Sequence, residues 1–129
     1  MLIGDPATHD WSRPTVDHVH LRVADLAASR AFYGELLEPL GIPLLLDTPG
    51  LVAFGNLALS ADGEPSTGVH IAFVAPTRRA VEAFHRVGLA AGGTDNGAPG
   101  PRPHGAYCAY VLDPDGNNIE AAHREWGSA

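Results

Sequence analysis

Two of the seven histidines in this sequence stand at matching places in segments of similar pattern. His18 opens the stretch HVHLRV and His70 opens HIAFV, and each stretch alternates apolar residues with others as a β-strand does. Glu120 lies in a third stretch of this kind, NNIEAAH. Two imidazoles and one carboxylate, with positions left for exogenous ligands, form the donor set of a facial-triad metal centre. A lone strand histidine is more often solvated than a ligand, but the matching placement of two favours a metal site.

Four further side chains are candidates for substrate contact or proton transfer. His20 and Arg22 share a strand face with His18, because side chains alternate across a strand, and are candidate substrate-binding residues. His104 and Tyr107 flank the start of the last hairpin and are candidate catalytic residues, since imidazole suits proton transfer near neutral pH. The competing interpretations are a plain loop residue for His104 and a core-edge aromatic for Tyr107. No role is assigned to the remaining histidines, or to the cysteine expected in the core: His9, His85, His123 and Cys108.

An internal repeat must position these residues. Residues 18–41 (HVHLRVADLAASRAFYGELLEPLG) match residues 70–93 (HIAFVAPTRRAVEAFHRVGLAAGG) at a constant offset and without a gap. Each copy opens with a strand and continues into a helix. The expected N-caps are Asp25 and Thr77, whose side-chain oxygens can accept bonds from the first free backbone N–H groups. Glycines follow both helix patterns and are expected to end the helices.

Three extended segments are expected after each helix. In the second copy a Gly/Pro-rich loop from about 92 to 105 has room for a short strand, and the turn DPDG joins the last two strands as a hairpin. The pattern βαβββ, twice, predicts an α+β fold in which two modules form a mixed, partly open barrel-like sheet around a groove, with the helices outside. A ferredoxin-like sandwich accounts less well for three extended segments. The strand ranges are 42–46, 51–54, 57–61, 106–112 and 117–123.

The length of 129 residues is that of one domain with a sizeable core. We expect this domain at residues 15–125, with module one at about 15–62 and module two at about 67–125. Residues 1–14 lack the basic start and apolar stretch of a signal peptide and are expected to form a leader. Such a leader either drapes over the fold or stays loose.

The charge balance excludes one class of partner. The chain has 15 Asp and Glu residues against eight Lys and Arg, a net charge of -7. Phosphate contacts need clustered basic side chains, so nucleic acid is not expected as a partner. No apolar run reaches the length of a membrane span, so no membrane contact is expected. Because the single cysteine cannot form an intrachain disulfide, a cytoplasmic location is expected.

Three stretches resemble the vicinal oxygen chelate superfamily, the group of glyoxalases, bleomycin-resistance proteins and extradiol dioxygenases: VDHVHLRVADLAASRAFY, TGVHIAFVAP and VLDPDGNNIEAAHRE. The resemblance covers about residues 15 to 125. It implies a divalent metal ion that chelates two neighbouring oxygens of a small-molecule substrate, with His18, His70 and Glu120 as ligands. It also implies a homodimer, with the site inside one chain or shared by two. Iron, manganese, zinc and nickel all suit these ligands.

One strand departs from the lactoylglutathione lyases of this superfamily, which carry a fourth ligand, a Glu, on the last strand of the first module. Aligning the Gly-Asn pairs at 55 and 116 puts Leu59 opposite Glu120, so that carboxylate is missing. The remaining two-His, one-Glu set is like that of extradiol dioxygenases, and we expect a small metal-dependent, dioxygenase-like enzyme. A metal-free protein that sequesters bleomycin-type antibiotics and a glyoxalase-type lyase or isomerase remain alternatives. Fosfomycin-type thiol transfer ranks last, because it needs more cationic residues.

Overall fold

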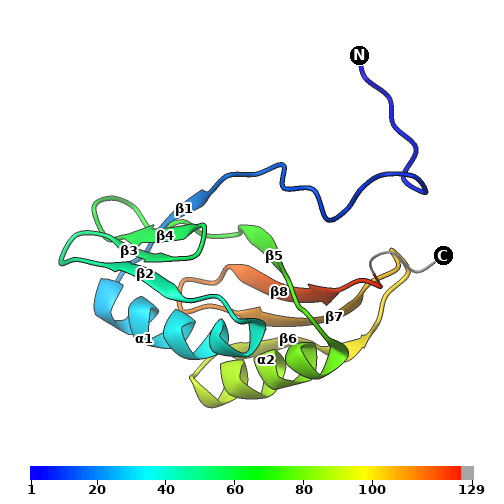
Figure 1. The fold of residues 1–129 in the computed structure, drawn as a ribbon. Helices are drawn as coiled ribbons and strands as arrows, with labels where there is room; N and C mark the ends of the chain where they lie inside the picture. Colours follow the sequence, from blue (N-terminus) through cyan, green and yellow to red (C-terminus); the bar gives the residue numbers. More distant parts are fainter. Residues whose placement is uncertain (126–129) are drawn as a thin grey trace.

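The computed structural model describes residues 1–125, and both copies of the repeat fold into the predicted succession of elements (Figure 1). The first module contains β1 (Val19–Arg22), α1 (Leu26–Leu36), a 3-10 turn η1 (Glu38–Leu40), β2 (Leu44–Asp47), β3 (Val52–Phe54) and β4 (Leu57–Ser60). The second contains β5 (His70–Val74), α2 (Arg78–Ala90), β6 (Thr94–Pro101), β7 (Tyr107–Leu112) and β8 (Asn118–His123). The βαβββ order predicted for each copy is therefore confirmed.

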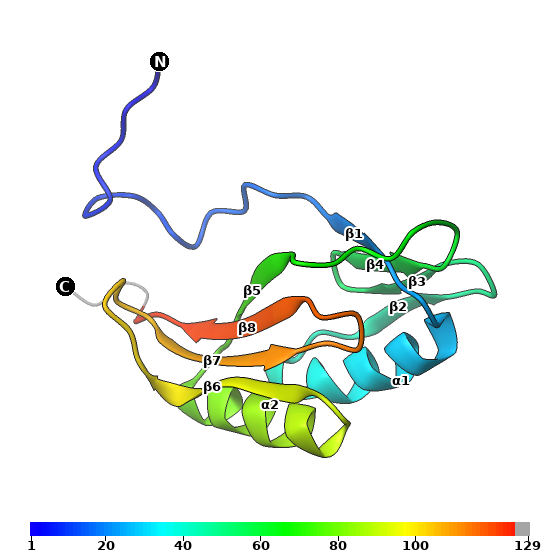
Figure 2. The same ribbon diagram turned by 180° about the vertical axis from the view of Figure 1, so that it is seen from behind.

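Each module forms its own four-stranded mixed sheet. The strand order is β1-β4-β3-β2 in the first sheet and β5-β8-β7-β6 in the second. The pairs β1–β4 and β5–β8 are parallel, and the other pairs are antiparallel. Both helices lie on one side of the two sheets, as the two views show (Figures 1 and 2). Within residues 1–125 the sheets do not close into a barrel. We call the side of each sheet away from the helices its open face.

Local sequence signals explain where the helices begin and end. The Asp25 side chain accepts a hydrogen bond from the Ala28 N–H, and the Thr77 side chain accepts one from the Ala80 N–H, so both predicted N-caps are confirmed. The first helix stops at Leu36, earlier than the glycine at 41 suggested. The segment that follows contains Pro39, which has no N–H to donate, and it continues as the 3-10 turn.

The strand β6 is longer than the short strand that the Gly/Pro-rich loop left room for. It spans eight residues and pairs with β7 through two shifts of register on either side of Gly97. The strand lies at the edge of its sheet, where Pro99 and Pro101 need no N–H for a further neighbour. Gly97 has a φ of 154° at a register shift, which glycine tolerates where the strand bulges.

The core lies between the helices and the sheets, and side chains of both modules form one cluster. The two helices contact one another and contribute the aromatic side chains Phe32, Tyr33 and Phe84, all buried. Burial of such side chains away from water is the main favourable term for the fold. Among residues 1–125, neither helix combines the length and apolar character needed to cross a bilayer.

A buried polar network ties the first module to the turn before β8. The Tyr33 hydroxyl of α1 donates to Asp113 Oδ2 at 2.5 Å. Asp113 also accepts bonds from the backbone N–H groups of Asp115 and Asn117, and the Asn117 side chain accepts one from the Val69 N–H. Burial and the negative charge of Asp113 raise the pKa of Tyr33 above its ordinary value. This network fixes the DPDG turn, and with it the start of β8.

Candidate functional site

The open face of the second sheet carries the polar residues that can do chemistry. Along β5 the side chains alternate: Phe73 is buried in the core cluster and Ile71 packs against that cluster, whereas His70, Ala72 and Val74 are exposed. The pairing of β5 with β8 sets Ala72 beside Glu120, so the carboxylate lies on the same open face as His70. Two of the three predicted ligands therefore share one face.

His70 and Glu120 are in direct contact. The distance from His70 Nε2 to Glu120 Oε1 is 2.8 Å. Glu120 is 4% exposed, whereas the His70 side chain is 52% exposed and reaches solvent. A carboxylate this buried needs a partner, because taking a charge out of water costs free energy unless a hydrogen bond or opposite charge offsets it. The structure thus brings these two residues together, and their role as ligands stays a prediction.

His18 does not join them within one chain. It immediately precedes β1, and its Nδ1 lies 2.7 Å from Asp17 Oδ2, with 68% of the side chain exposed. Among residues 1–125, the one group of three metal-ligating side chains that meet closely does not include His18. That His18 is a metal ligand stays a prediction, and it requires an arrangement of the modules that the single chain does not contain.

The group that does meet closely consists of His104, Cys108 and Glu120. One ligand atom of each lies within 4.8 Å of the other two, and Cys108 Sγ is 3.9 Å from His104 Nε2. Burial and the neighbouring Glu120 carboxylate raise the pKa of the Cys108 thiol to about 12. Cys108 is buried, as predicted, but it lies on the open face beside Glu120 instead of in the cluster under the helices.

Sequence reasoning missed the roles of Cys108 and Tyr110 at this site. In the β7–β8 hairpin Cys108 pairs with Ala122 and Tyr110 pairs with Glu120, so all four side chains point to one face. The Tyr110 ring lies 6.0 Å from the His70 ring. Burial and the charge of Glu120 raise the pKa of Tyr110 above its ordinary value. The tight DPDG turn fixes this register, so counting outward from the turn would have found both residues.

Tyr107, the other predicted catalytic residue, lies on the opposite face of the sheet from Glu120. Its hydroxyl donates to Glu82 Oε2 of α2 at 3.1 Å, and the Arg78 guanidinium lies 4.9 Å from the ring centre. Burial and the Glu82 carboxylate raise the pKa of Tyr107. These are the contacts of an aromatic at the edge of the core, the competing interpretation for this residue. Of the two predicted catalytic residues, only His104 adjoins Glu120.

The predicted substrate-binding residues form a chain of contacts on the first sheet. His20 Nε2 lies 2.7 Å from Ser60 Oγ, and Ser60 Oγ donates to Asp62 Oδ1 at 2.6 Å. Arg22 Nε lies 3.3 Å from the same Asp62 oxygen. The hydrogen bond from Ser60 lowers the pKa of Asp62. Because the serine stands between the imidazole and the carboxylate, this is not the Ser-His-Asp order of a hydrolase, in which the imidazole takes the serine proton.

The position equivalent to Glu120 in the first sheet is Ala58, not Leu59. The parallel register pairs His20 with Ala58, as it pairs Ala72 with Glu120, whereas Leu59 is fully buried on the helix side. β8 begins two residues after its turn glycine, and β4 begins two residues after Gly55. The two strands nevertheless differ by one residue in their register to the parallel neighbouring strand, so the alignment on the Gly-Asn pairs is wrong by one residue. The conclusion that a fourth carboxylate is missing from this position holds.

The open face of the second sheet borders a cavity of about 520 Å³. Trp11 of the leader and Thr15 at the start of the predicted domain reach this cavity, and the Trp11 ring lies 4.3 Å from the Arg124 guanidinium. The leader therefore contacts the domain at the rim of the cavity. The remaining lining residues are Ala72, Phe73, Val74, His104, Glu120 and Ala122.

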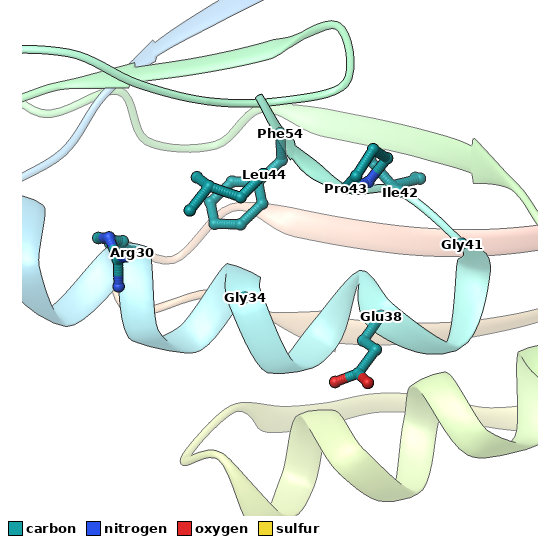
Figure 3. Close-up of a pocket in the computed structure, with 8 residues that line it drawn as sticks. All are labelled: Arg30, Gly34, Glu38, Gly41, Ile42, Pro43, Leu44 and Phe54. Carbon is teal, nitrogen blue, oxygen red and sulfur yellow. The ribbon is translucent and has the colours of Figure 1, made fainter. Parts of the chain in front are cut away.

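A second cavity, of about 490 Å³, lies between α1 and β2 (Figure 3). Leu44 and Phe54 lie together over the helix, and Glu38 points away from them. Arg30, at one end, donates two hydrogen bonds to Asp47 at 2.9 and 2.7 Å. The lining is mostly apolar, and its two charged side chains do not contact each other. This cavity lacks the acid–base and metal-ligating groups that meet on the second sheet.

Comparisons with known proteins agree with this fold. The family model described as "Glyoxalase/Bleomycin resistance protein/Dioxygenase superfamily" matches residues 15–121. A glyoxalase/bleomycin resistance protein from Albidiferax ferrireducens T118 is 35% identical, with a TM-score of 0.76 over 84% of this chain and 98% of that chain. No curated protein matches the chain significantly.

Two further solved structures are each 26% identical to this chain. A glyoxalase-related enzyme from Fulvimarina pelagi has a TM-score of 0.67 over 85% of this chain and 88% of that chain. A lactoylglutathione lyase from Agrobacterium tumefaciens has a TM-score of 0.64 over 91% of this chain and 99% of that chain. The similarity therefore extends over most of the chain.

Proposed function

The chain belongs to the Glyoxalase/Bleomycin resistance protein/Dioxygenase superfamily, and from that membership we propose that it is a metal-dependent enzyme acting on a small molecule with two neighbouring oxygens. Within this class we propose an extradiol dioxygenase-like activity on catechol-type substrates. The observation that carries the proposal is the contact between His70 and Glu120, two ligand types from separate strands that meet on an open face.

The residues on this face fit a divalent cation. Glu120 is a buried carboxylate that faces a cavity, and His70 supplies a nitrogen donor beside it. The side-chain oxygen of Asn118, which pairs with His70, is buried and has no hydrogen-bond partner among the described residues. An unsatisfied buried oxygen calls for an explanation such as an ion or water. A bound ion would act as a Lewis acid that polarises a substrate oxygen.

The chain's own residues have separate tasks in this proposal. His70 and Glu120, with His18 as the third ligand, hold the ion. His104, at the same cavity, exchanges a proton with the substrate, since histidine is the side chain that most often transfers protons in enzymes. His20 and Arg22, on the open face of the first sheet, bind polar groups of the substrate. The polar chain through Ser60 and Asp62 orients His20 and Arg22 for that task.

We also propose that a second copy of the chain completes the site. His18 immediately precedes β1 of the first sheet and does not join His70 and Glu120 within one chain, so the ligand set needs another arrangement of modules. Three consecutive apolar side chains of the edge strand β2 are left exposed: Leu44 by 40%, Leu45 by 67% and Leu46 by 40%. Exposed apolar side chains of this kind mark interaction surfaces, and closed two-fold pairing is the commonest way to cover them.

Metal analysis of protein purified without chelators tests the proposal. The wild-type protein is expected to carry a divalent ion, and His70→Ala and Glu120→Gln are expected to lose it. His85→Gln is the matched control, because His85 lies on α2 and contacts Asp95 away from the open face. Full metal content in His70→Ala and Glu120→Gln would overturn the proposal. Oxygen consumption by iron(II)-loaded protein with a panel of catechols then tests the reaction itself.

A glyoxalase-type lyase or isomerase is the second candidate. The similarity to the lyase from Agrobacterium tumefaciens favours it, and the alanine at position 58, where a fourth ligand would stand, weighs against it. Isomerisation of a glutathione hemithioacetal without oxygen consumption would select this candidate over the dioxygenase. Antibiotic sequestration without a metal would instead be indicated by drug binding that chelators leave unchanged.

A further inference from the structure

We propose that the second module by itself binds a zinc-type ion through Cys108, His104 and Glu120, within a single chain and without His18. The three ligand atoms already lie within 4.8 Å of one another. This inference requires no pairing of modules and no dioxygenase chemistry, so it stands or falls separately from the proposed function.

The spacing of the sulfur and nitrogen atoms is close to that of two ligands in a tetrahedral site. With bonds of about 2.3 Å from zinc to sulfur and about 2.1 Å to nitrogen, two tetrahedral ligands stand roughly 3.6 Å apart. The measured distance from Cys108 Sγ to His104 Nε2 is 3.9 Å. Cys108 and Glu120 are diagonal neighbours on the paired strands β7 and β8, which fixes two ligands rigidly. His104 lies in the exposed segment before β7 and can rotate to complete the set.

The donor types select the ion. A thiolate, an imidazole and a carboxylate together favour zinc or cobalt over magnesium, calcium or manganese, which prefer oxygen ligands. The Cys108 proton passes to solvent when the ion binds, because the thiolate is the ligand. Three protein ligands leave a fourth position open, as in catalytic zinc sites, and this position faces the cavity of about 520 Å³ that His104 and Glu120 line.

His70 has a supporting part in this site. Its Nε2 is 2.8 Å from Glu120 Oε1, closer than two ligands stand at a tetrahedral zinc ion, so in this site it holds the carboxylate from outside the ligand set. Glu120 belongs to both this set and the set proposed with His18 and His70. The two sets therefore compete, and one carboxylate serves one ion at a time.

Cobalt(II) titration of the reduced, chelator-treated full-length protein tests the inference, because thiolate coordination adds charge-transfer absorption in the near ultraviolet. We expect this absorption in the wild type and in His18→Ala, and its loss in Cys108→Ser. His70→Ala is expected to keep the absorption while cobalt affinity falls about 10- to 100-fold, as for loss of an outer partner. Circular dichroism and thermal melting of metal-free Cys108→Ser establish that the variant is folded, and Cys108→Ala serves as a second variant.

The outcomes separate the two proposals. Cobalt bound at saturation without thiolate absorption overturns this inference, and if that binding is lost in His18→Ala it supports the set with His18 instead. Thiolate absorption that His18→Ala leaves unchanged supports the single-module site, whatever the oxygen-consumption assay gives. Unchanged cobalt affinity in Cys108→Ser, with the protein folded, also overturns it.

Discussion

Replacing Tyr33 by Phe is expected to lower the free energy of unfolding by about 2 kcal/mol, within the range of about 1.5–3 kcal/mol for hydrogen bonds to charged groups. The substitution keeps the aromatic ring and removes the hydroxyl that donates to Asp113 Oδ2 at 2.5 Å. Tyr33 is 0% exposed and Asp113 6%, so water cannot replace the lost donor. Asp113 keeps the bonds from Asp115 and Asn117, which holds the loss below the upper limit.

Thermal unfolding measures this effect. An unfolding entropy of about 2.1 cal/mol/K per residue gives about 0.27 kcal/mol/K for a chain of 129 residues. A loss of about 2 kcal/mol therefore lowers the melting midpoint by about 7 °C. Tyr107→Phe is the matched control, because its hydroxyl contacts Glu82 at 3.1 Å in an exposed setting, and its midpoint is expected to stay that of the wild type. Equal shifts in the two variants would refute the reasoning.

The same bond predicts a pH dependence of stability. Burial and the charge of Asp113 raise the pKa of Tyr33 in the folded protein. A raised folded pKa means that the unfolded chain loses the phenolic proton first, near pH 10, so the contribution is complete below that pH and is lost as pH rises further. Urea unfolding at about pH 8 and about pH 11 should therefore show a steeper alkaline decline in the wild type than in Tyr33→Phe. An identical decline in both proteins would contradict this assignment.

Three further predictions concern packing, assembly and the buried carboxylate. A Cβ at Gly93 would lie 2.4 Å from Val111 Cγ1, so Gly93→Ala is expected to lower the free energy of unfolding in urea by about 1–3 kcal/mol. Gly50 has open space around it, so Gly50→Ala should have the stability of the wild type. Leu45→Glu, at a side chain 67% exposed, should dissociate the proposed dimer in sedimentation velocity, and a dimer that persists would exclude Leu45 from the interface. Glu120→Gln removes the charge of a side chain that is 4% exposed and is expected to abolish metal binding. In the absence of metal, its unfolding midpoint in urea is expected to equal or exceed that of the wild type, and a lower midpoint would indicate a structural role for the carboxylate.

The fold could be predicted where local pattern and pairing agree. Strand and helix alternate with the same spacing in both copies, and the caps at Asp25 and Thr77 mark the helix starts, so the βαβββ order follows from the chain itself. The strand β6 could not be predicted in full, because Pro99 and Pro101 argue against any strand unless its place at the sheet edge is known. That place is a property of the whole sheet and not of the segment.

The site could be predicted only as far as one sheet determines it. Alternation along β5 and β8 was enough to put His70 and Glu120 on one face, and they are in contact. Cys108 is buried, as the sequence predicts, but its place beside Glu120 depends on the register of the hairpin and not on burial. The position of His18 depends on how one module meets another, and side-chain alternation within a strand carries no information about that.

The burial of Glu120 links these observations through electrostatics. A carboxylate that is 4% exposed loses most of its hydration, and only opposite charge or donated hydrogen bonds can offset that loss. Among residues 1–125 its close polar neighbours are the half-exposed imidazole of His70, the imidazole of His104 and the thiol of Cys108, and none of them is a permanent cation. A structural ion pair would use arginine, yet Arg102 lies over the Tyr110 ring and donates to the Ala98 carbonyl. A negative charge held in this way, at the wall of a cavity and close to a histidine nitrogen and a buried cysteine sulfur, is matched best by a cation that comes from solution.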